Sequence, residues 1–317
     1  MAEPTKKIVL TGIAGKLGRL VAQRLHRMGT HEVVGVDRRP IDRLPKDVQH
    51  LQVDLRSRRT RDVFRGGDVD AVVHLGLMHD PRRTAEELHT WNVLGTARLL
   101  EDCADFNVRK VVVLSSANVY GPRADNTQFL TEESPLMAGV EFPAIRDLVE
   151  ADMQATSFFW RSVGREIETV VLRPVHILGS VRNAASNYLR LKTIPVMMGY
   201  DPMIQVIHER DVTEALVLAL RPGIHGILNL AGPGEVPLRV LIHELGKPML
   251  SIPGPLFESA VKTLWRFHLT SFPMPELAYI KYTCMVDGSR ARQALGFRAR
   301  HSLKETIRAV LPVGEAE

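Results

Sequence analysis

The segment from Lys6 to Leu25 constrains the fold more than any other part of the chain. It begins with an unbroken apolar run at residues 8–10, which is typical of a strand buried on both faces of a parallel sheet. Glycines follow at positions 12, 15 and 18, and apolar residues then recur at helical spacing up to Leu25. A strand, a glycine-rich turn and a helix form the context in which such a motif binds a dinucleotide.

Each glycine in this turn has a physical role. We expect Gly12 to permit the sharp turn, Gly15 to let a pyrophosphate approach the backbone, and Gly18 to let the helix pack closely on the strand. The predicted helix begins near Lys16 and Leu17. Its first N–H groups and the positive end of its dipole would face the phosphates.

The second predicted strand, residues 31–36, ends at Asp37, about 20 residues beyond the glycine turn. An acidic residue there can accept hydrogen bonds from the adenosine ribose; a simple turn cap is the alternative interpretation. Asp37 would repel a 2′-phosphate, which favours NAD. Arg38 and Arg39 would attract one, so NADP is left open.

Composition excludes several classes. The 317 residues are 45% hydrophobic and 24% charged, as in ordinary globular proteins. The net charge of +5 comes with basic clusters at 38–43, 56–65 and 82–83, but aromatic residues are not interleaved, so we expect no nucleic-acid partner. No apolar run reaches the roughly 18 residues of a spanning helix. Two distant cysteines and no targeting segment predict a cytoplasmic protein, and no metal site is predicted.

Strands and helices alternate along the first half of the chain. Alternation of this kind predicts a doubly wound parallel sheet of the Rossmann type, with right-handed crossovers. We expect a dinucleotide-binding domain at 1–175 and a smaller C-terminal α/β substrate-binding region at 176–317, partly interleaved with the first. The predicted strands are 8–10, 31–36, 48–53, 70–75, 111–115, 169–172, 205–208 and 227–230, and the predicted helices begin near 17 and cover 86–106, 141–162, 211–221, 289–295 and 303–311.

Several short motifs occur in the order seen in one known family. They are Thr11 to Gly18 (TGxxGxxG), Asp54-Leu55, His74-Leu75-Gly76, Asn92 to Thr96 (NVxGT), Ser115 to Gly121 (SSxxVYG), Leu172-Arg173-Pro174, Ile207 to Val212 and Leu295-Gly296-Phe297. Together they resemble the extended short-chain dehydrogenase/reductase family, the NAD-dependent epimerase/dehydratase group, over nearly the whole chain.

The resemblance implies a set of site residues. Ser116 would be the catalytic serine, whose hydroxyl polarises a substrate carbonyl. Asn92 is as readily structural as functional. The implied cofactor-binding set is Gly12, Gly15, Lys16, Leu17, Gly18, Asp37, Arg38, Asp54, Leu55, Leu75, Gly76, Asn92, Ser115, Arg146 and Pro174.

One departure bears on activity. The family carries its catalytic Tyr and Lys as YxxxK, at i and i+4 on one helix face. Pro135-Leu136 and Glu150 set the register, which places Phe142 and Arg146 at these positions. Phe142 cannot transfer a proton. Arg146 keeps a charge that can bind ribose and is retained as a catalytic candidate, but its pKa is too high for proton transfer. The substitutes considered are Tyr120, Glu141, Asp147, His176 and Tyr188.

Two functional hypotheses follow. One is an oxidoreductase, epimerase or dehydratase acting on a nucleotide sugar or a related alcohol or carbonyl compound, with a non-standard proton path. The other is a catalytically silent NAD(P)-binding sensor, regulator or partner module. Arg182 and Arg190 are candidates for a substrate diphosphate, with solvated surface as the alternative. The resemblance also implies a homodimer. The apolar segment Pro255–Tyr282 is interpreted as substrate-domain core in preference to a lipid-contacting surface.

Overall fold

A computed structural model describes residues 6–66, 68–78, 83–141, 145–164, 166–257, 259 and 278–311. Its centre is a sheet of seven strands whose neighbours are all parallel. Strands that are buried on both faces need side chains that are apolar on both faces, which explains the continuous apolar runs in the sequence. In spatial order the strands are β10 (Gly226–Leu230), β6 (Glu168–Pro174), β5 (Lys110–Leu114), β4 (Val69–His74), β1 (Lys6–Thr11), β2 (His31–Asp37) and β3 (Val48–Gln52).

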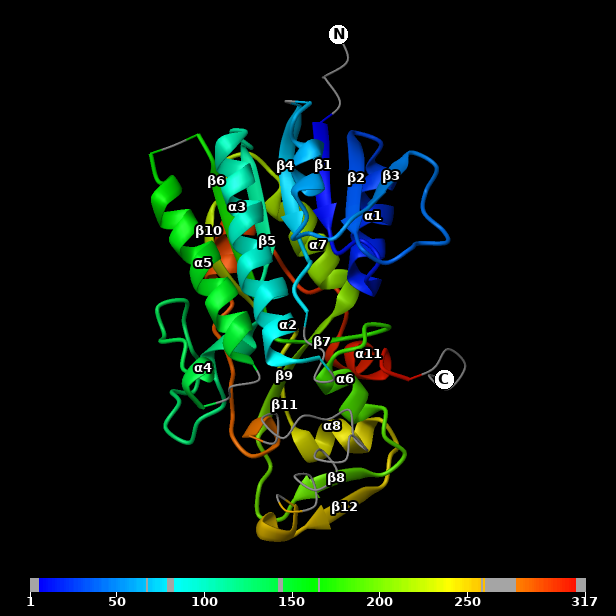
Figure 1. Cartoon of the computed structure of the whole chain (residues 1–317). Coiled ribbons are helices and arrows are strands. Elements are labelled where there is room, and N and C mark those ends of the chain that lie inside the picture. The colour runs from blue at the N-terminus through cyan, green and yellow to red at the C-terminus, as the bar shows by residue number, and fades with distance from the viewer. Residues whose placement is uncertain are drawn as a thin grey trace.

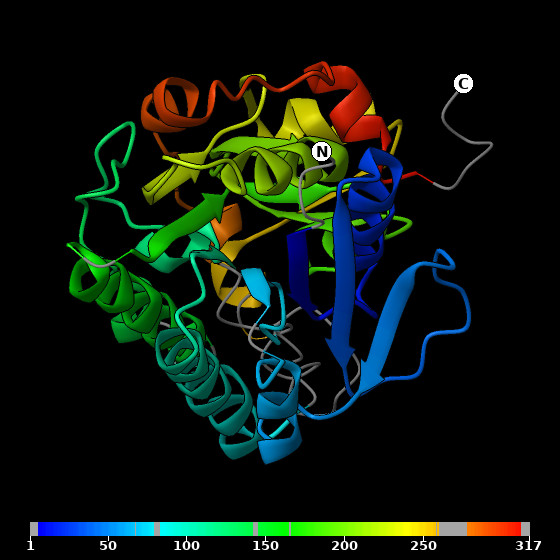
Figure 2. The same cartoon turned by 90° about the horizontal axis from the view of Figure 1, so that it is seen from above.

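Helices cover both faces of this sheet (Figure 2). On one face α1 (Lys16–Met28) and α7 (Glu209–Ala219) pack side by side, and their apolar residues share a core with the strands. On the other face α3 (Gly95–Asp105) and α5 (Arg146–Ser162) bury a second core that includes Leu99, Cys103 and Phe158. The predicted doubly wound parallel sheet is therefore confirmed.

The predicted helix at 86–106 is divided into three parts. The helix α2 (Ala85–His89) runs into a π-helical turn, η2 (Thr90–Leu94), before α3 begins. Trp91 and Asn92 lie in this turn, and both bond to backbone groups in the segment after β4. Helical periodicity alone does not reveal such a turn, because its cause lies in distant backbone groups.

The predicted helix at 141–162 is also shorter than expected. The regular helix α5 begins at Arg146, and a separate short helix, α4 (Ala138–Glu141), precedes it. Phe142, which the sequence predicts at the family's tyrosine position, lies outside the described residues. Two short 3₁₀ turns, η1 (Arg58–Val63) and η3 (Ala117–Tyr120), complete this half of the chain.

The remaining elements lie beyond the carboxyl ends of the large sheet (Figure 1). They form a three-stranded sheet of β7 (His176–Leu178), β9 (Met203–His208) and β11 (Glu235–Pro237), and a pair of β8 (Ile194–Met197) and β12 (Met249–Ile252). A third core lies among them. The helices of this part are α6 (Ala184–Leu189), α8 (Leu238–Glu244) and α11 (Leu303–Arg308), whereas α10 (Ser289–Leu295) belongs to the core of the large sheet.

The chain after residue 175 returns to the large sheet. The helix α7 packs on α1, β10 forms the edge beside β6, and α10 packs on β10. The division at residue 175 stays a proposal. Most of the apolar segment Pro255–Tyr282 lies outside the described residues. Among the helices that are described, none combines the length and the apolar character that a membrane span requires.

Candidate cofactor and substrate site

The glycine turn has no room for side chains at two of its positions. Gly12 has a φ of +75°, and a Cβ there would lie 2.7 Å from the carbonyl oxygen of Leu75. A Cβ on Gly18 would lie 2.4 Å from the carbonyl oxygen of Gly12. Both contacts are with backbone, which cannot move aside as a flexible side chain would. The turn is therefore held between β4 and α1 in a conformation that only glycine permits.

Between these glycines the start of α1 is open to an anion. Gly15 caps the helix without a side-chain hydrogen bond, and the first turn contains no acidic residue. The exposed Lys16 adds a positive charge at this end, and Leu17 packs against the core. Unsatisfied N–H groups, a positive helix dipole and no competing carboxylate suit a pyrophosphate.

Asp37 ends β2 beside this turn and is 6% exposed. Its carboxylate accepts hydrogen bonds from the backbone N–H of Ala14, at 3.1 Å, and from the backbone and guanidinium of Arg39, at 2.9–3.0 Å. Burial alone raises the pKa of Asp37, but the hydrogen bonds from Arg39 and Ala14 outweigh it and hold the pKa below its usual value. Asp37 is therefore an anion fixed at the edge of the cofactor turn.

Asp54 repeats this arrangement at the end of the next strand. Arg56 donates to its carboxylate from the backbone N–H, Nε and Nη2 at 2.7–2.9 Å, which lowers the pKa of Asp54. Leu55 is buried between these two residues in sequence. The guanidinium of Arg38 lies 4.8 Å from the ring centroid of Trp91, and that of Arg56 lies 5.4 Å from it. Two acid–arginine pairs therefore border the proposed adenosine end. The spacing Asp-x-Arg is visible in the sequence, but its pairing was not predicted.

Asn92 joins η2 to the segment after β4. The fully buried side chain donates to the carbonyl of Met78 at 2.8 Å and accepts from its N–H at 2.7 Å. Trp91 also donates to the carbonyl of Gly76. These bonds hold the backbone around Leu75 and Gly76, so the contacts of Asn92 support its structural role; a contact with the cofactor stays a prediction.

The two neighbouring serines after β5 have different partners. Ser115 donates its hydroxyl to the buried carboxylate of Asp152 on α5. Asp152 also receives two bonds from Arg173 on β6, at 2.6 and 2.9 Å. The hydroxyl of Ser116 accepts a bond from the N–H of Asn118 at 3.1 Å, which leaves its proton available to a ligand. The contacts therefore favour Ser116 over Ser115 for contact with a substrate oxygen.

Tyr120, one of the substitutes considered for the missing tyrosine, belongs to the buried network. Its hydroxyl accepts from Arg173 at 2.9 Å and donates to Asn229 at 2.8 Å, and it is 1% exposed. Burial raises its pKa to about 12, although Arg173 opposes the shift. Because it is buried, doubly bonded and hard to ionise, Tyr120 is a poor proton donor or acceptor for a substrate.

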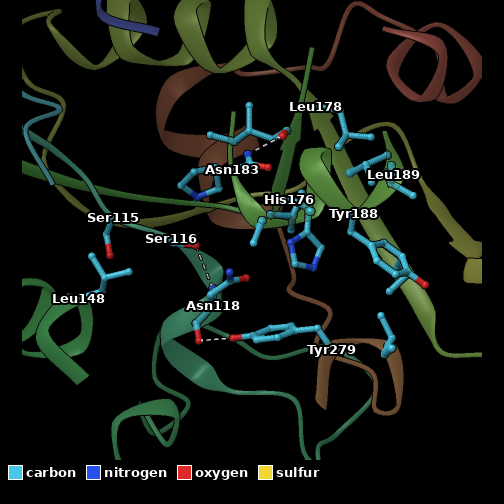
Figure 3. Close-up of a pocket in the computed structure, with 18 of the residues that line it drawn as sticks. Ser115, Ser116, Asn118, Leu148, His176, Leu178, Asn183, Tyr188, Leu189 and Tyr279 are labelled. Carbon is cyan, nitrogen blue, oxygen red and sulfur yellow. Dashed lines mark hydrogen bonds between the residues drawn. The ribbon is translucent and has the colours of Figure 1, made fainter. Parts of the chain in front are cut away.

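A cavity of about 260 Å³ opens beside Ser116. Figure 3 shows Ser115, Ser116 and Asn118 on one side of it, Leu178, Leu189 and Tyr188 on the other, and His176 between them. Tyr279 packs edge-on against His176, with ring centroids 5.6 Å apart, and donates to the carbonyl of Asn118 at 2.8 Å. Burial lowers the pKa of His176 to about 4, so its imidazole is neutral at pH 7. Leu75, Leu148 and Pro174 also line the cavity.

The remaining candidates lie away from this cavity's lining. Arg146, at the start of α5, has an exposed side chain that donates to Glu150 at 3.0 Å. Asp147 bonds to His89 at 3.1 Å. His89, Asp147 and Glu150 bring three possible metal ligands within 4.8 Å of one another at the surface, and Arg146 already pairs with this cluster. The side chain of Glu141 lies outside the described part, so its role and that of Arg146 stay predictions.

Comparison with known proteins agrees with this geometry. The model of the NAD dependent epimerase/dehydratase family matches residues 8–231, which cover the glycine turn, both serines and most of the large sheet. The chain belongs to the NAD dependent epimerase/dehydratase family. This family is part of the group that the sequence motifs resemble, so the resemblance is confirmed, and with it the expectation of NAD as the family's cofactor.

Two curated relatives span nearly all of the chain. An uncharacterised protein of Mycobacterium bovis is 27% identical over 320 residues, covering 95% of this chain and 82% of its own length. UDP-glucose 4-epimerase of Bacillus subtilis is 24% identical over 322 residues, covering 94% of each chain. Among solved structures, MoeE5 in complex with UDP-glucuronic acid and NAD has a TM-score of 0.73 and 24% identity, covering 96% of this chain and 97% of its own. At this identity the structural likeness establishes the fold.

Proposed function

We propose that the protein is an NAD-dependent oxidoreductase, epimerase or dehydratase that acts on an alcohol or carbonyl compound bound in the cavity beside Ser116. NAD, when bound, supplies a site that accepts or returns a hydride. The observation that carries the proposal is the adjacency of two features: an anion-binding glycine turn at the end of β1, and a cavity lined by residues that follow β4, β5 and β6. Ligands of doubly wound sheets bind at these strand ends.

The residues of the chain have distinct roles in this proposal. The first N–H groups of α1 hold the pyrophosphate, and Asp37 accepts the ribose hydroxyls once its bonds to Arg39 rearrange. Ser116 donates its free proton to the substrate oxygen, which stabilises the charge that develops there during hydride transfer. His176 faces the same cavity with a neutral ring, which offers one N–H donor and one acceptor nitrogen that can orient a substrate oxygen.

The second hypothesis, a catalytically silent NAD(P)-binding protein, is supported by one specific observation. The register set by Pro135 and Glu150 puts Phe142 where the family has its tyrosine. Arg146, at the lysine position, is paired with Glu150 in an exposed ion pair. If no other group moves the substrate proton, the cofactor site would serve sensing or regulation.

Equilibrium binding and turnover separate the two hypotheses. Titration with NADH and with NADPH measures the cofactor site and tests whether Arg38 and Arg39 admit a 2′-phosphate. Absorbance of NADH with a panel of nucleotide sugars, ketones and alcohols measures turnover. We expect NADH binding and turnover of at least one substrate; NADH binding without turnover of any would favour the silent protein, and failure to bind either nucleotide would overturn both.

Variants then test the proposed roles. Ser116→Ala should lower kcat at least tenfold while the Kd for NADH changes less than twofold, since the hydroxyl acts only on the substrate. The exposed Ser157→Ala on α5 is the matched control. Replacement of His176 by Phe, which keeps a ring but no nitrogen, should lower kcat without loss of NADH binding. An unchanged kcat in either site variant would remove that residue from the mechanism.

The substrate class, the oligomeric state and the compartment are part of the proposal. UDP-glucose 4-epimerase and MoeE5 suggest a nucleotide sugar as one substrate class.

A homodimer is expected through α3 and α5. On α5, the side chains of Met153 and Trp160 are 57% and 64% exposed to solvent. Sedimentation velocity of Trp160→Glu beside the unchanged protein tests it: a dimer that persists would contradict this interface. A cytoplasmic location is expected.

A further inference from the structure

The cavity beside Ser116 carries no charged side chain among the residues described as lining it. Its apolar lining comes from segments that are far apart in the sequence. The apolar lining consists of Leu75, Leu77, Leu114, Leu148, Pro174, Val175, Ile177, Leu178, Ala184, Ala185, Leu189, Ile204, Val206, Leu238, Leu241 and Ile280.

The polar groups of the lining are neutral at pH 7, and those on the far side are bonded within the protein. Asn183, beside Leu178, donates to the carbonyl of Ile177 at 2.8 Å and accepts from the N–H of Ser186 at 2.8 Å. Ser115, Ser116 and Asn118 lie at the carboxyl end of β5, across the cavity from Leu178 and Leu189 (Figure 3). Tyr188 donates its hydroxyl to the carbonyl of Pro195 at 2.7 Å. A ligand in this cavity therefore meets the hydroxyl of Ser116 at one end, the neutral ring of His176 along its side, and hydrocarbon over most of its surface.

The arginines that could hold a diphosphate are otherwise engaged or lie outside the lining. Arg190 donates to the carbonyls of Gly179 at 2.6 Å and Val181 at 3.0 Å, and also to that of Val310 at 3.3 Å. Arg182 is exposed and does not line the cavity. A diphosphate carries negative charge into a site where the described residues offer no cation, and an unpaired buried charge is costly.

We propose that the substrate of this cavity is an uncharged, mainly apolar alcohol or ketone, with its single reactive oxygen at the Ser116 end. This inference rests on the proposed function, because it names the substrate class of the same site. An apolar, uncharged substrate differs from the nucleotide sugars that the relatives suggest. The recognition is by burial of hydrocarbon, with one hydrogen-bonded oxygen setting the orientation.

The test compares binding of neutral apolar and charged probes to the full-length protein. Calorimetric titrations use cyclohexanone, 2-decalone, UDP and UDP-glucose, each with and without NADH. Burial of each extra methylene tightens binding about fourfold when the cavity accommodates it. We expect 2-decalone to bind at least tenfold more tightly than cyclohexanone, and more tightly than UDP or UDP-glucose. Tighter binding of either uridine nucleotide would overturn the proposal, as would equal affinities for the two ketones.

A pair of variants on α6 locates the binding. Ala185 lines the cavity, whereas Asn187, two residues further along the same helix, does not. Ala185→Phe should weaken 2-decalone at least tenfold, and Asn187→Phe should leave it within twofold. Unchanged binding in Ala185→Phe would overturn the assignment to this cavity. If Ala185→Phe fails to fold, the ketone series on the unchanged protein still decides.

These measurements distinguish two kinds of failure. Binding of 2-decalone is read without turnover, so it can succeed where hydride transfer fails. Apolar binding with no redox change for any substrate would contradict the proposed oxidoreductase and leave the cavity assignment standing. Turnover of a nucleotide sugar without 2-decalone binding would support the proposed oxidoreductase and contradict the apolar substrate class.

Discussion

Asp152 on α5 accepts two hydrogen bonds from the guanidinium of Arg173 on β6, and neither side chain is more than 2% exposed. The hydroxyl of Ser115 also donates to Asp152, and Tyr120 accepts from Arg173 at 2.9 Å. This network lies directly behind the serines that border the substrate cavity. It ties β5 to α5, and because Ser115 donates its proton to Asp152, Ser116 is the serine with a proton available to a ligand.

Removal of one partner of this pair should destabilise the fold strongly. Arg173→Met leaves the carboxylate of Asp152 buried without its cation, which typically costs about 3–5 kcal/mol. Urea denaturation measures the free energy of unfolding. The control is Arg300→Met, whose guanidinium pairs with Glu214 at 3.8 Å on the surface and should change stability by about 1 kcal/mol or less. Equal effects of the two variants would contradict the importance given to burial.

A methyl group on Gly18 should disturb cofactor binding. The added Cβ would lie 2.4 Å from the Gly12 carbonyl oxygen and 2.7 Å from the Cα of Ile13, so the turn or α1 must shift. Gly18→Ala should weaken NADH binding at least tenfold, as measured by fluorescence titration. Gly234→Ala serves as the control, because a Cβ there meets no atom within 4 Å. NADH affinity that is equal in both variants would argue against the turn as the pyrophosphate site.

His74 should make the fold less stable in acid. It is fully buried between Thr11 and Thr96, at 2.6 and 3.0 Å, and burial lowers its pKa from 6.5 to about 4. The unfolded chain therefore takes up a proton below about pH 6.5 that the folded protein excludes until about pH 4. The stability from neutral His74 is present above this window and lost as the pH falls through it, by about 3 kcal/mol at most.

The unfolding free energy, measured between pH 7 and pH 4, tests this prediction. Burial also lowers the pKa of His176, His31 and His208, so the unchanged protein carries their contributions as well. His74→Gln should flatten the pH dependence, whatever its effect on stability at pH 7. Replacement of the exposed His243 by Gln should leave the slope unchanged. A slope that is the same in His74→Gln as in the unchanged protein would contradict the neutral, buried state of His74.

Asn92 should contribute to stability more than to cofactor chemistry. Asn92→Ala leaves the N–H and carbonyl of Met78 without their partners, and each lost buried bond costs about 1–3 kcal/mol. We expect a lower melting temperature together with an NADH affinity that changes only through the position of Gly76. Thermal unfolding and NADH titration on the same samples separate the two effects. A large loss of NADH affinity at unchanged melting temperature would assign Asn92 to the cofactor site.

Local features of the sequence were sufficient for the cofactor half of the site. The turn at Gly12 to Gly18 and the acid at Asp37 follow strands whose apolar runs are readable, and parallel strands bring their carboxyl ends to one edge. The helix boundaries at 86–106 and 141–162 were less accurate. The π-helical turn at Trp91 and Asn92 depends on bonds to Gly76, 15 residues before Trp91, and to Met78, 14 residues before Asn92. Helical periodicity does not reveal such bonds.

The different roles of Ser115 and Ser116 could not be predicted from the sequence. They are adjacent and chemically identical in the sequence, and both belong to one motif. Both line the cavity, but they differ in hydrogen bonding: Ser115 donates its hydroxyl proton to Asp152 on α5, whereas Ser116 only accepts, from the N–H of Asn118. The burial of Asp152 was not predicted, because an acidic residue on a helix is usually expected on the solvent-exposed face.

The sequence by itself determined the parallel sheet, the glycine turn and the acid beside it, because periodicity and turn chemistry are local properties. It also predicts that Phe142 occupies the position of the family's tyrosine. Only the tertiary structure decided the character of the substrate cavity. Its walls come from residues between Leu75 and Ile280, and the absence of charge along its described lining results from which side chains these distant segments bring together. The residues that line the cavity are therefore set by contacts between segments far apart in the sequence.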